Sequence, residues 1–139
     1  MRYFLSALAL TAIASSCVTA KSAIGINCRG SLMCPLFAPK NESIMNHDIA
    51  KTLRDLIVND THWYEDGEHI KCIEGKWISG GDICAFLEGT RGLSGYDIKT
   101  LAYRITEHNC QVCGGVPVYF DKKENDVRLH GQLKFDFVS

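Results

Sequence analysis

The chain has 139 residues, with 15 basic residues, 16 acidic residues and five histidines. This length predicts one domain around one hydrophobic core. The near balance of charge excludes the dense basic face that a nucleic-acid partner requires, so we expect no nucleic acid among its partners.

The first 20 residues have the pattern of a secretory signal peptide. Arg2 gives a positive start, residues 3–14 are apolar apart from two hydroxyl residues, and Val18 and Ala20 suit a cleavage site. This apolar run is shorter than the roughly 20 residues that span a bilayer. We therefore expect a signal peptide at 1–20 and a secreted domain at 21–139 that does not insert into membranes. Loss of Arg2 leaves 14 basic and 16 acidic residues.

The first half of the mature chain predicts a short strand and a helix. Alternation at Ile24 and Ile26 favours the strand, and residues 30–40, with two prolines, favour a loop. A helical stripe follows, and Ser43 or Asn46 could cap its start. The stripe consists of Met45, Ile49, Leu53, Leu56 and Ile57.

Short apolar runs separated by turn residues predict strands in the middle of the chain. These runs are Ile70–Ile73, Trp77–Ile78 and Ile83–Leu87. The polar stretch 61–68 before them carries no strand pattern.

A second helix and two further strands are predicted in the last third. The helical stripe is made by Ile98, Leu101, Ala102 and Ile105, and Ser94 stands at capping distance before Asp97. Val118–Phe120 favours a strand. In the run 132–138, Leu133, Phe135 and Phe137 alternate with polar residues, which is typical of a sheet with one buried face.

These elements together predict an α+β fold. A mostly antiparallel sheet of about five strands, with two helices packed on one face, would bury both helical stripes and leave the polar strand residues in water. We call this arrangement an α/β sandwich and expect Leu101 and Phe135 to meet in its core.

Six cysteines remain after removal of the signal peptide, and in an exported domain an even number predicts three disulfides. Each would stabilise the domain by about 2–4 kcal/mol. The six are Cys28, Cys34, Cys72, Cys84, Cys110 and Cys113. Two glycosylation sequons, at Asn41 and Asn59, fit the same route.

The Cys110-Gln-Val-Cys113 motif has three interpretations. A redox pair favours a helix start, whereas this pair follows a helix, at the negative end of its dipole. A zinc site would need Cys28 and Cys34 as two further ligands. Because oxidising export favours disulfides, we expect two structural bridges from this corner to the N-terminal segment.

Several motifs, taken in order, resemble the killer-protein-4 toxin family, first known as a virally encoded toxin of smut fungi. These are Ile24-Gly-Ile-Asn-Cys-Arg-Gly-Ser31, Cys110-Gln-Val-Cys113-Gly, Val116-Pro-Val-Tyr119, Asn125-Asp-Val127, Gly131-Gln-Leu133 and Phe137-Val138. The resemblance covers the two ends of the mature chain and is loose between about residues 35 and 88.

The resemblance implies a disulfide-held α/β sandwich with the pairs Cys28–Cys110 and Cys34–Cys113, which leaves Cys72 and Cys84 for each other. The founding toxin has further cysteines, and Tyr64 stands where one of them would be. It is also markedly basic, unlike this mature chain.

The resemblance also implies a function, which is inhibition of growth of a competing fungus or a plant through interference with calcium entry at the cell surface. The expected partner is a target-cell surface protein, with a calcium channel as the implied target. A basic residue before the central strands matters in the family, and Lys71 is its nearest match, one residue closer to the cysteine than in the family pattern. An ordinary solvent-facing strand residue is the equal alternative for Lys71.

We expect no catalytic residues, no metal, no cofactor and a monomer. The strongest enzyme alternative is a small secreted ribonuclease that would recruit His130, Arg128 and either Glu68 or Glu88. A third alternative is a non-toxic secreted effector that keeps the scaffold and binds a host surface protein.

Overall fold

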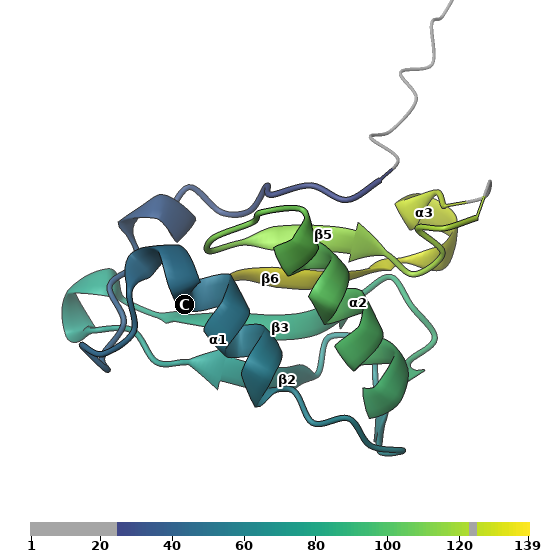
Figure 1. The fold of residues 1–139 in the computed structure, drawn as a ribbon, viewed down its shortest axis with the longest axis horizontal. Helices are drawn as coiled ribbons and strands as arrows, with labels where there is room; N and C mark the ends of the chain where they lie inside the picture. The colour runs from purple at the N-terminus through teal and green to yellow at the C-terminus, as the bar shows by residue number, and fades with distance from the viewer. Residues whose placement is uncertain (1–24, 123–124) are drawn as a thin grey trace, which may run out of the picture.

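The computed structural model describes residues 25–122 and 125–139 of the chain (Figure 1). The predicted signal peptide and Ile24 lie outside these residues. Four strands form the main sheet in the order β2-β3-β6-β5, and every neighbouring pair is antiparallel. They are β2 (His69–Ile73), β3 (Asp82–Glu88), β5 (Gly114–Pro117) and β6 (Gln132–Val138).

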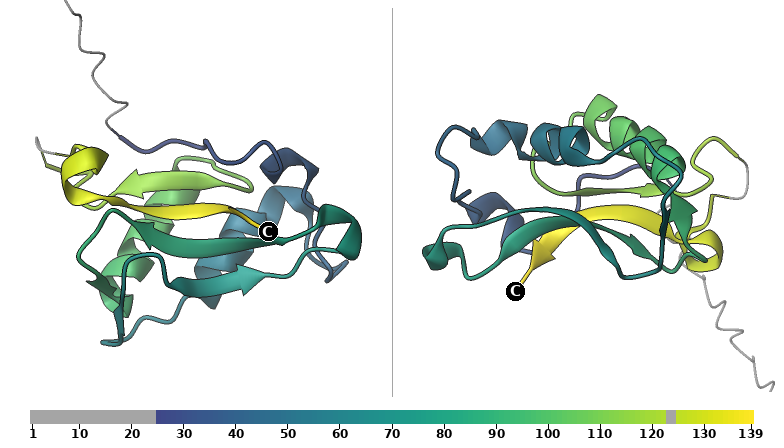
Figure 2. Two further views of the ribbon diagram at one scale, coloured as in Figure 1. Left: turned by 180° about the vertical axis from the view of Figure 1, so that it is seen from behind. Right: turned by 90° about the horizontal axis from the view of Figure 1, so that it is seen from below.

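Two helices lie on one face of this sheet, as the right-hand view of Figure 2 shows. They are α1 (Ile49–Leu56) and α2 (Gly95–Glu107). The predicted α+β sandwich is confirmed. The remaining two strands, β1 (Trp63–Tyr64) and β4 (Leu93–Ser94), form a separate antiparallel ribbon.

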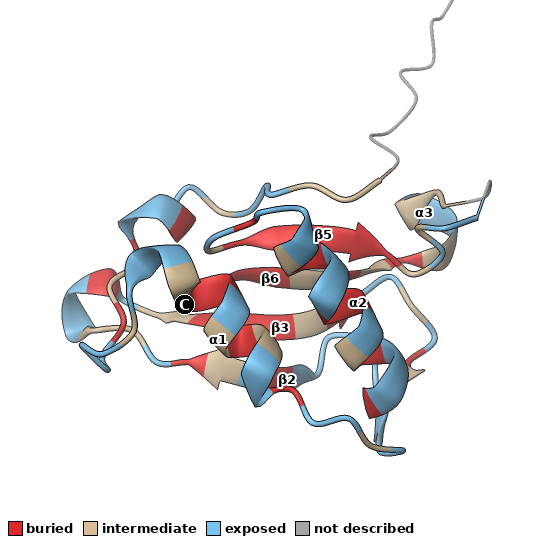
Figure 3. Cartoon of the chain, viewed as in Figure 1, coloured by how far each residue is buried: buried red, intermediate tan, exposed pale blue. Residues whose placement is uncertain are grey.

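The core lies between the helices and the sheet, and the buried stretches of the strands run beneath α1 and α2 in Figure 3. Alternation along β3 and β6 sends one set of side chains into this layer. The buried residues contributed by the two strands are Ile83, Ala85, Leu87, Leu133 and Phe135. They meet the helical stripes, which include Leu53 and Leu101. The predicted contact layer of Leu101 and Phe135 is therefore confirmed.

The second helix begins where its sequence predicts. The Ser94 hydroxyl accepts a hydrogen bond from the Asp97 backbone N–H at 3.2 Å and donates one to the Asp97 carboxylate at 2.7 Å. After the helix, Asn109 adopts a φ of 63°, a left-handed conformation that asparagine tolerates and that ends the helix. The chain then turns into the Cys110 corner.

The first helix begins later than predicted. A short 3-10 turn, η2 (Asn46–Asp48), precedes it, and neither Ser43 nor Asn46 caps it; Met45 and Asp48 occupy the two cap positions without a side-chain hydrogen bond. The backbone N–H of Ala50 instead donates to the carbonyl of Gln111 at 2.8 Å. A tertiary partner thus satisfies a donor that a local cap would otherwise take.

Two predicted strands are wrong. Trp77 and Ile78 belong to the 3-10 turn η3 (Trp77–Ser79), because Gly80 reverses the chain with a φ of 72° and the Ser79 hydroxyl bonds both backbone groups of Ala38. The strand expected at Val118–Phe120 lies earlier, at Gly114–Pro117, and residues 118–120 form a turn.

Small elements complete the fold. A 3-10 turn, η1 (Cys34–Leu36), follows the N-terminal segment, and the single-turn helix α3 (Val127–His130) precedes β6. The N-terminal segment itself adds one antiparallel bridge, Asn27 to Gly115, beside β5. These elements are too short for periodicity to reveal.

Candidate functional site

Two disulfides fasten the N-terminal segment to the corner that follows α2. Cys28 is joined to Cys110 and Cys34 to Cys113, across 82 and 79 residues of chain. These are the pairs that the family resemblance implies. Bridges that close such long loops restrict the unfolded chain strongly.

The disulfides exclude the zinc and redox interpretations of the Cys110-Gln-Val-Cys113 motif. All four sulfurs of the proposed zinc site are bonded in pairs, so none is available as a thiolate ligand. The two cysteines of the motif also bond to different partners and form no disulfide with each other. The motif is a structural corner.

A buried carboxylate holds the N-terminal segment against the sheet. Asp136, on β6, is 8% exposed, and its Oδ1 accepts hydrogen bonds from the backbone N–H groups of Ser31 at 2.7 Å and Phe137 at 2.8 Å. The Lys134 ammonium lies 3.2 Å from Oδ2. A Cβ on Gly30 would come within 2.8 Å of Oδ1, so this approach requires glycine.

The third disulfide joins the edge strand β2 to β3. Cys72 and Cys84 are directly opposite each other in the register, and 12 residues separate them in sequence. Buried Ile70 and Ile73 anchor the same strand in the core. The bridge and the two isoleucines therefore fix the position of Lys71, which stands between them.

Lys71 is an exposed residue on this edge strand. The neighbouring lysines are neutralised, since Lys40 lies 2.8 Å from Glu74 and Lys76 lies 2.9 Å from Glu42. Within residues 25–122 and 125–139, Lys71 forms no ion pair of this kind. Lys71 is thus an exposed cation on a strand held in place, with no carboxylate at ion-pair distance in the described part of the chain.

The strand geometry also supports a structural role for Lys71. Its register with β3 shifts between His69 and Lys71, which marks a β-bulge. Bulges and edge lysines both discourage a second chain from pairing with an open strand. Protection of the edge therefore competes with target binding as the reason for a lysine here.

Both sequons lie in loops. Asn41 and Asn59 are exposed, and the Asn41 side-chain oxygen accepts a hydrogen bond from the Ser43 backbone N–H at 3.0 Å. Asn41 also borders a hollow of about 550 Å³ between the 40–44 loop, α1 and β2, lined by Ile44 and Leu56 among others. Glycosylation of both asparagines stays a prediction.

One end of the molecule displays large apolar side chains that the sequence did not predict to be exposed. The turns η1 and η3 lie at the same end of the molecule (Figures 1 and 2), and Ala38, in the segment after η1, is hydrogen-bonded to Ser79 of η3. We call this surface the apolar end; its members are Leu32, Leu36, Trp77 and Ile78. Trp77 is 92% exposed. Sequence reasoning missed it because a tryptophan in an apolar run usually indicates a buried strand.

The side chains named for a ribonuclease are engaged with other partners. Arg128 forms a two-nitrogen contact with Asp126, which raises the pKa of Arg128. Glu88 accepts a hydrogen bond from Gln132 at 2.6 Å, and Glu68 accepts one from the Glu65 backbone at 2.9 Å.

His130 rests edge-on against the Tyr119 ring, with 4.9 Å between ring centroids. In the part of the chain that the structure describes, no hydrogen bond or ion pair joins His130 to Arg128, Glu68 or Glu88. The acid–base pairing that general acid–base catalysis requires is therefore not assembled around His130.

The protein is a small α+β domain held by three disulfides, with the exposed Lys71 on its edge strand. These features define its class. A family model described as Kp4 matches residues 10–139. The chain therefore belongs to the Kp4 family and is a killer-toxin-like protein. The search of curated proteins gave no match.

The described part of the chain contains no helix long and apolar enough to cross a membrane. Three disulfides are consistent with export into an oxidising compartment.

Proposed function

We propose that this protein is a secreted toxin that inhibits the growth of competing fungi or plant cells by interfering with calcium uptake at their surface. It acts as a monomer by binding a target-cell surface protein, with a calcium channel as the target, and catalyses no reaction. The observation that carries the proposal is the match of the Kp4 family model to residues 10–139.

Lys71 supports this proposal as the contact residue. A cation acts on a channel mouth through its electric field, and that field is strongest where no carboxylate cancels it. The bridge at Cys72 and the buried Ile70 and Ile73 keep β2 in place. Little backbone conformational entropy is then lost when the lysine binds.

Growth assays on fungi and on plant roots, with and without added external calcium, test the proposal. We expect growth to slow and extra calcium to relieve the inhibition. Higher ionic strength should also weaken the effect, because salt screens exposed charges. Inhibition that ignores calcium would contradict the calcium mechanism while leaving toxicity in place.

The residue is tested with Lys71→Gln, which removes the charge and keeps a polar side chain of similar length. Lys51→Gln is the matched control, because Lys51 is an exposed lysine on the outer side of α1. We expect Lys71→Gln to lose most of the growth inhibition at unchanged thermal stability, and Lys51→Gln to keep it. Equal activity of the two variants would assign Lys71 to edge protection alone.

A second candidate function is a non-toxic effector that binds a host surface protein. The apolar end favours it, because exposed tryptophans are enriched among residues that dominate protein interfaces. Paired charges of both signs, Lys40–Glu74 and Lys76–Glu42, stand near Trp77, as at the polar rim of an interface. Loss of host-cell binding in Trp77→Ser, with no growth inhibition by the unchanged protein, would favour this function.

A further inference from the structure

The three disulfides differ in the polar group next to their sulfur atoms. In the Cys34–Cys113 bridge the neighbour is a carboxylate, because an Asp136 oxygen and both sulfurs lie within 4.8 Å of one another. In the Cys28–Cys110 bridge it is a backbone oxygen, that of His108, 3.9 Å from the Cys28 sulfur. In the Cys72–Cys84 bridge it is an imidazole, because a ring nitrogen of His69 and both sulfurs lie within 4.8 Å of one another.

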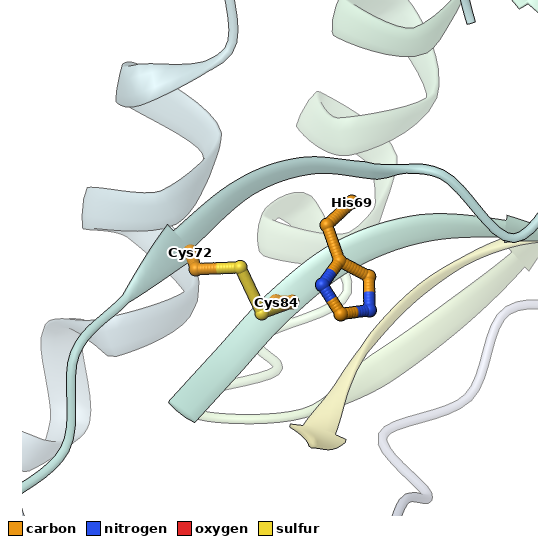
Figure 4. A group of neighbouring side chains, drawn as sticks. All are labelled: His69, Cys72 and Cys84. Atoms are coloured by element: carbon orange, nitrogen blue, oxygen red, sulfur yellow. A yellow bond between two sulfur atoms is a disulfide. The ribbon is translucent and has the colours of Figure 1, made fainter. Parts of the chain in front are cut away.

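Figure 4 shows the His69 ring beside the Cys72–Cys84 bond, on the same side of the β2–β3 pair. In the β2–β3 register His69 is paired with Phe86, and Cys72 with Cys84. The ring centroids of His69 and Phe86 are 6.1 Å apart. This is the sheet face opposite to the helices. His69 is exposed and Cys72 is half-buried, so both residues have surface in contact with solvent.

We propose that Cys72–Cys84 is a reactive disulfide that exchanges with small-molecule thiols such as glutathione, assisted by His69. A thiolate RS⁻ attacks the accessible sulfur of Cys72, an RS–S bond forms, the Cys72–Cys84 bond breaks, and its electron pair leaves as the Cys84 thiolate. The imidazolium of His69 stabilises that thiolate or protonates it. A second thiol then releases RSSR and leaves two reduced cysteines, so that electrons and protons balance.

Electrostatics favours this bridge over the other two. A nearby cation stabilises a leaving thiolate and attracts an attacking one, whereas a carboxylate opposes both steps. Asp136 is also opposite Cys84 in the β3–β6 register, but the sulfurs grouped with its carboxylate oxygen within 4.8 Å are those of Cys34 and Cys113, and Lys134 lies 3.2 Å from its Oδ2. No comparable cluster of histidine or acidic side chains includes Cys28 or Cys110 among the described residues.

The short loop closed by Cys72–Cys84 also favours opening of this bridge. The sequence separation between the paired cysteines is 12 residues for Cys72–Cys84, whereas it is 82 for Cys28–Cys110 and 79 for Cys34–Cys113. The bridge therefore restricts the unfolded chain least, and its loss is the one that the fold tolerates best. Reduction would remove the covalent link between β3 and the edge strand that carries Lys71, and would leave both disulfides of the N-terminal corner in place.

Solvent exposure alone predicts a different order in which the disulfides open, so the two explanations can be told apart by experiment. Cys28 is exposed, whereas Cys72 is half-buried and Cys84 is 1% exposed. If access to solvent controlled the reaction, Cys28–Cys110 would open first. If the neighbouring group controls it, Cys72–Cys84 opens first.

The experiment treats the purified oxidised protein with reduced glutathione, quenches samples over time with an alkylating reagent, and maps the modified cysteines by mass spectrometry. We expect Cys72 and Cys84 to be modified before any other pair. We expect His69→Gln to slow that step about threefold to tenfold, as the loss of a stabilising cation near a leaving thiolate should. Earlier opening of either other bridge would overturn the proposal.

Two controls separate chemistry from structure. His62→Gln changes an exposed histidine that rests against Tyr64, away from the sulfurs, and should leave the rate unchanged. His69→Arg, which keeps a positive charge at this position, should retain more of the rate than His69→Gln, because a cation beside the sulfurs is what assists the exchange. The other charged groups on this face include Glu88 and Asp136, which both pair with Lys134. Asp82 alternates onto the same face and accepts a hydrogen bond from the Gly75 backbone N–H, and Arg29 borders the hollow beside Lys134 and Asp136.

Equal rates for His69→Gln and the unchanged protein would also overturn the proposal. The readout is chemical and requires no target cell, so its result does not depend on the proposed toxin activity.

Discussion

The two faces of the main sheet are made by the same four strands but differ in their side chains: one face is apolar and covered by helices, and the other is polar and cross-linked. The face beneath α1 and α2 carries Ile83, Ala85 and Phe135, all completely buried. The opposite face carries the partners that alternate with them, namely the Cys72–Cys84 bridge, Lys134 and Asp136. A residue's place in the two-residue repeat of a strand therefore decides whether it joins the apolar core or the polar, cross-linked face, where Cys84 and Asp136 are also buried.

The comparison shows that different interactions stabilise the two faces of this small disulfide-held fold. On the covered face, burial of apolar area is the main term. The open face has no second layer of helices, and it is fastened by one carboxylate, by the Cys72–Cys84 bridge and by the neighbouring N-terminal segment. Polar contacts and cross-links there replace a second core.

The largest effect is expected on the covered face. Phe135→Ala should lower the free energy of unfolding by about 3–5 kcal/mol, and Leu101→Ala by about 2–5 kcal/mol, because each leaves a cavity in a dense core. Denaturant unfolding measures both. Phe86→Ala, on the open face, is the matched control and should lose clearly less, since Phe86 is only half-buried. Equal losses in the free energy of unfolding for Phe86→Ala and Phe135→Ala would show that the two faces contribute equally to stability.

A smaller loss is expected from the carboxylate of the open face. Asp136→Ala removes the acceptor of two backbone N–H groups, those of Ser31 and Phe137, and should cost about 1–3 kcal/mol of stability. Asp121→Ala, which removes an exposed carboxylate, is the control. An Asp136→Ala variant as stable as this control would mean that the two bridges hold the N-terminal segment without Asp136.

The smallest effect is expected at the exposed ion pairs near η3. The hydrogen bond and charge of Lys40 lower the pKa of Glu74, and those of Lys76 lower the pKa of Glu42. A carboxyl with a lowered folded-state pKa adds stability above its unfolded value, about 4.3, and loses it as the pH falls through the folded value. Thermal melts between pH 5 and pH 2 should therefore show a slightly shallower decline for Glu74→Gln.

Glu65→Gln serves as the control for this measurement, since the structure gives the Glu65 carboxylate no ion pair among the residues it describes. The same pH dependence in Glu74→Gln and in the unchanged protein would show that the Lys40–Glu74 pair contributes nothing measurable, as many exposed pairs do.

The elements with long periodic patterns could be predicted from the sequence, and those controlled by tertiary contacts could not. Both helices and the strands β3 and β6 follow stripes or alternation, and the Ser94 cap is local chemistry. The strand at Gly114–Pro117 was not predicted, because two glycines carry no strand signal. The turn at Trp77 was mistaken for a strand, because its reversal depends on Gly80 and on the contact between Ser79 and Ala38.

The sequence alone determined the α+β class and the three disulfides, because residue spacing and an even number of cysteines are local or countable properties. Only the tertiary structure placed His69 beside the Cys72–Cys84 bond. Residues three apart in a regular strand point to opposite faces. The bulge between His69 and Lys71 shifts the register by one residue, so His69 and Cys72 pair with Phe86 and Cys84, which share a face. A bulge depends on how two strands meet, and the sequence of one strand does not encode it.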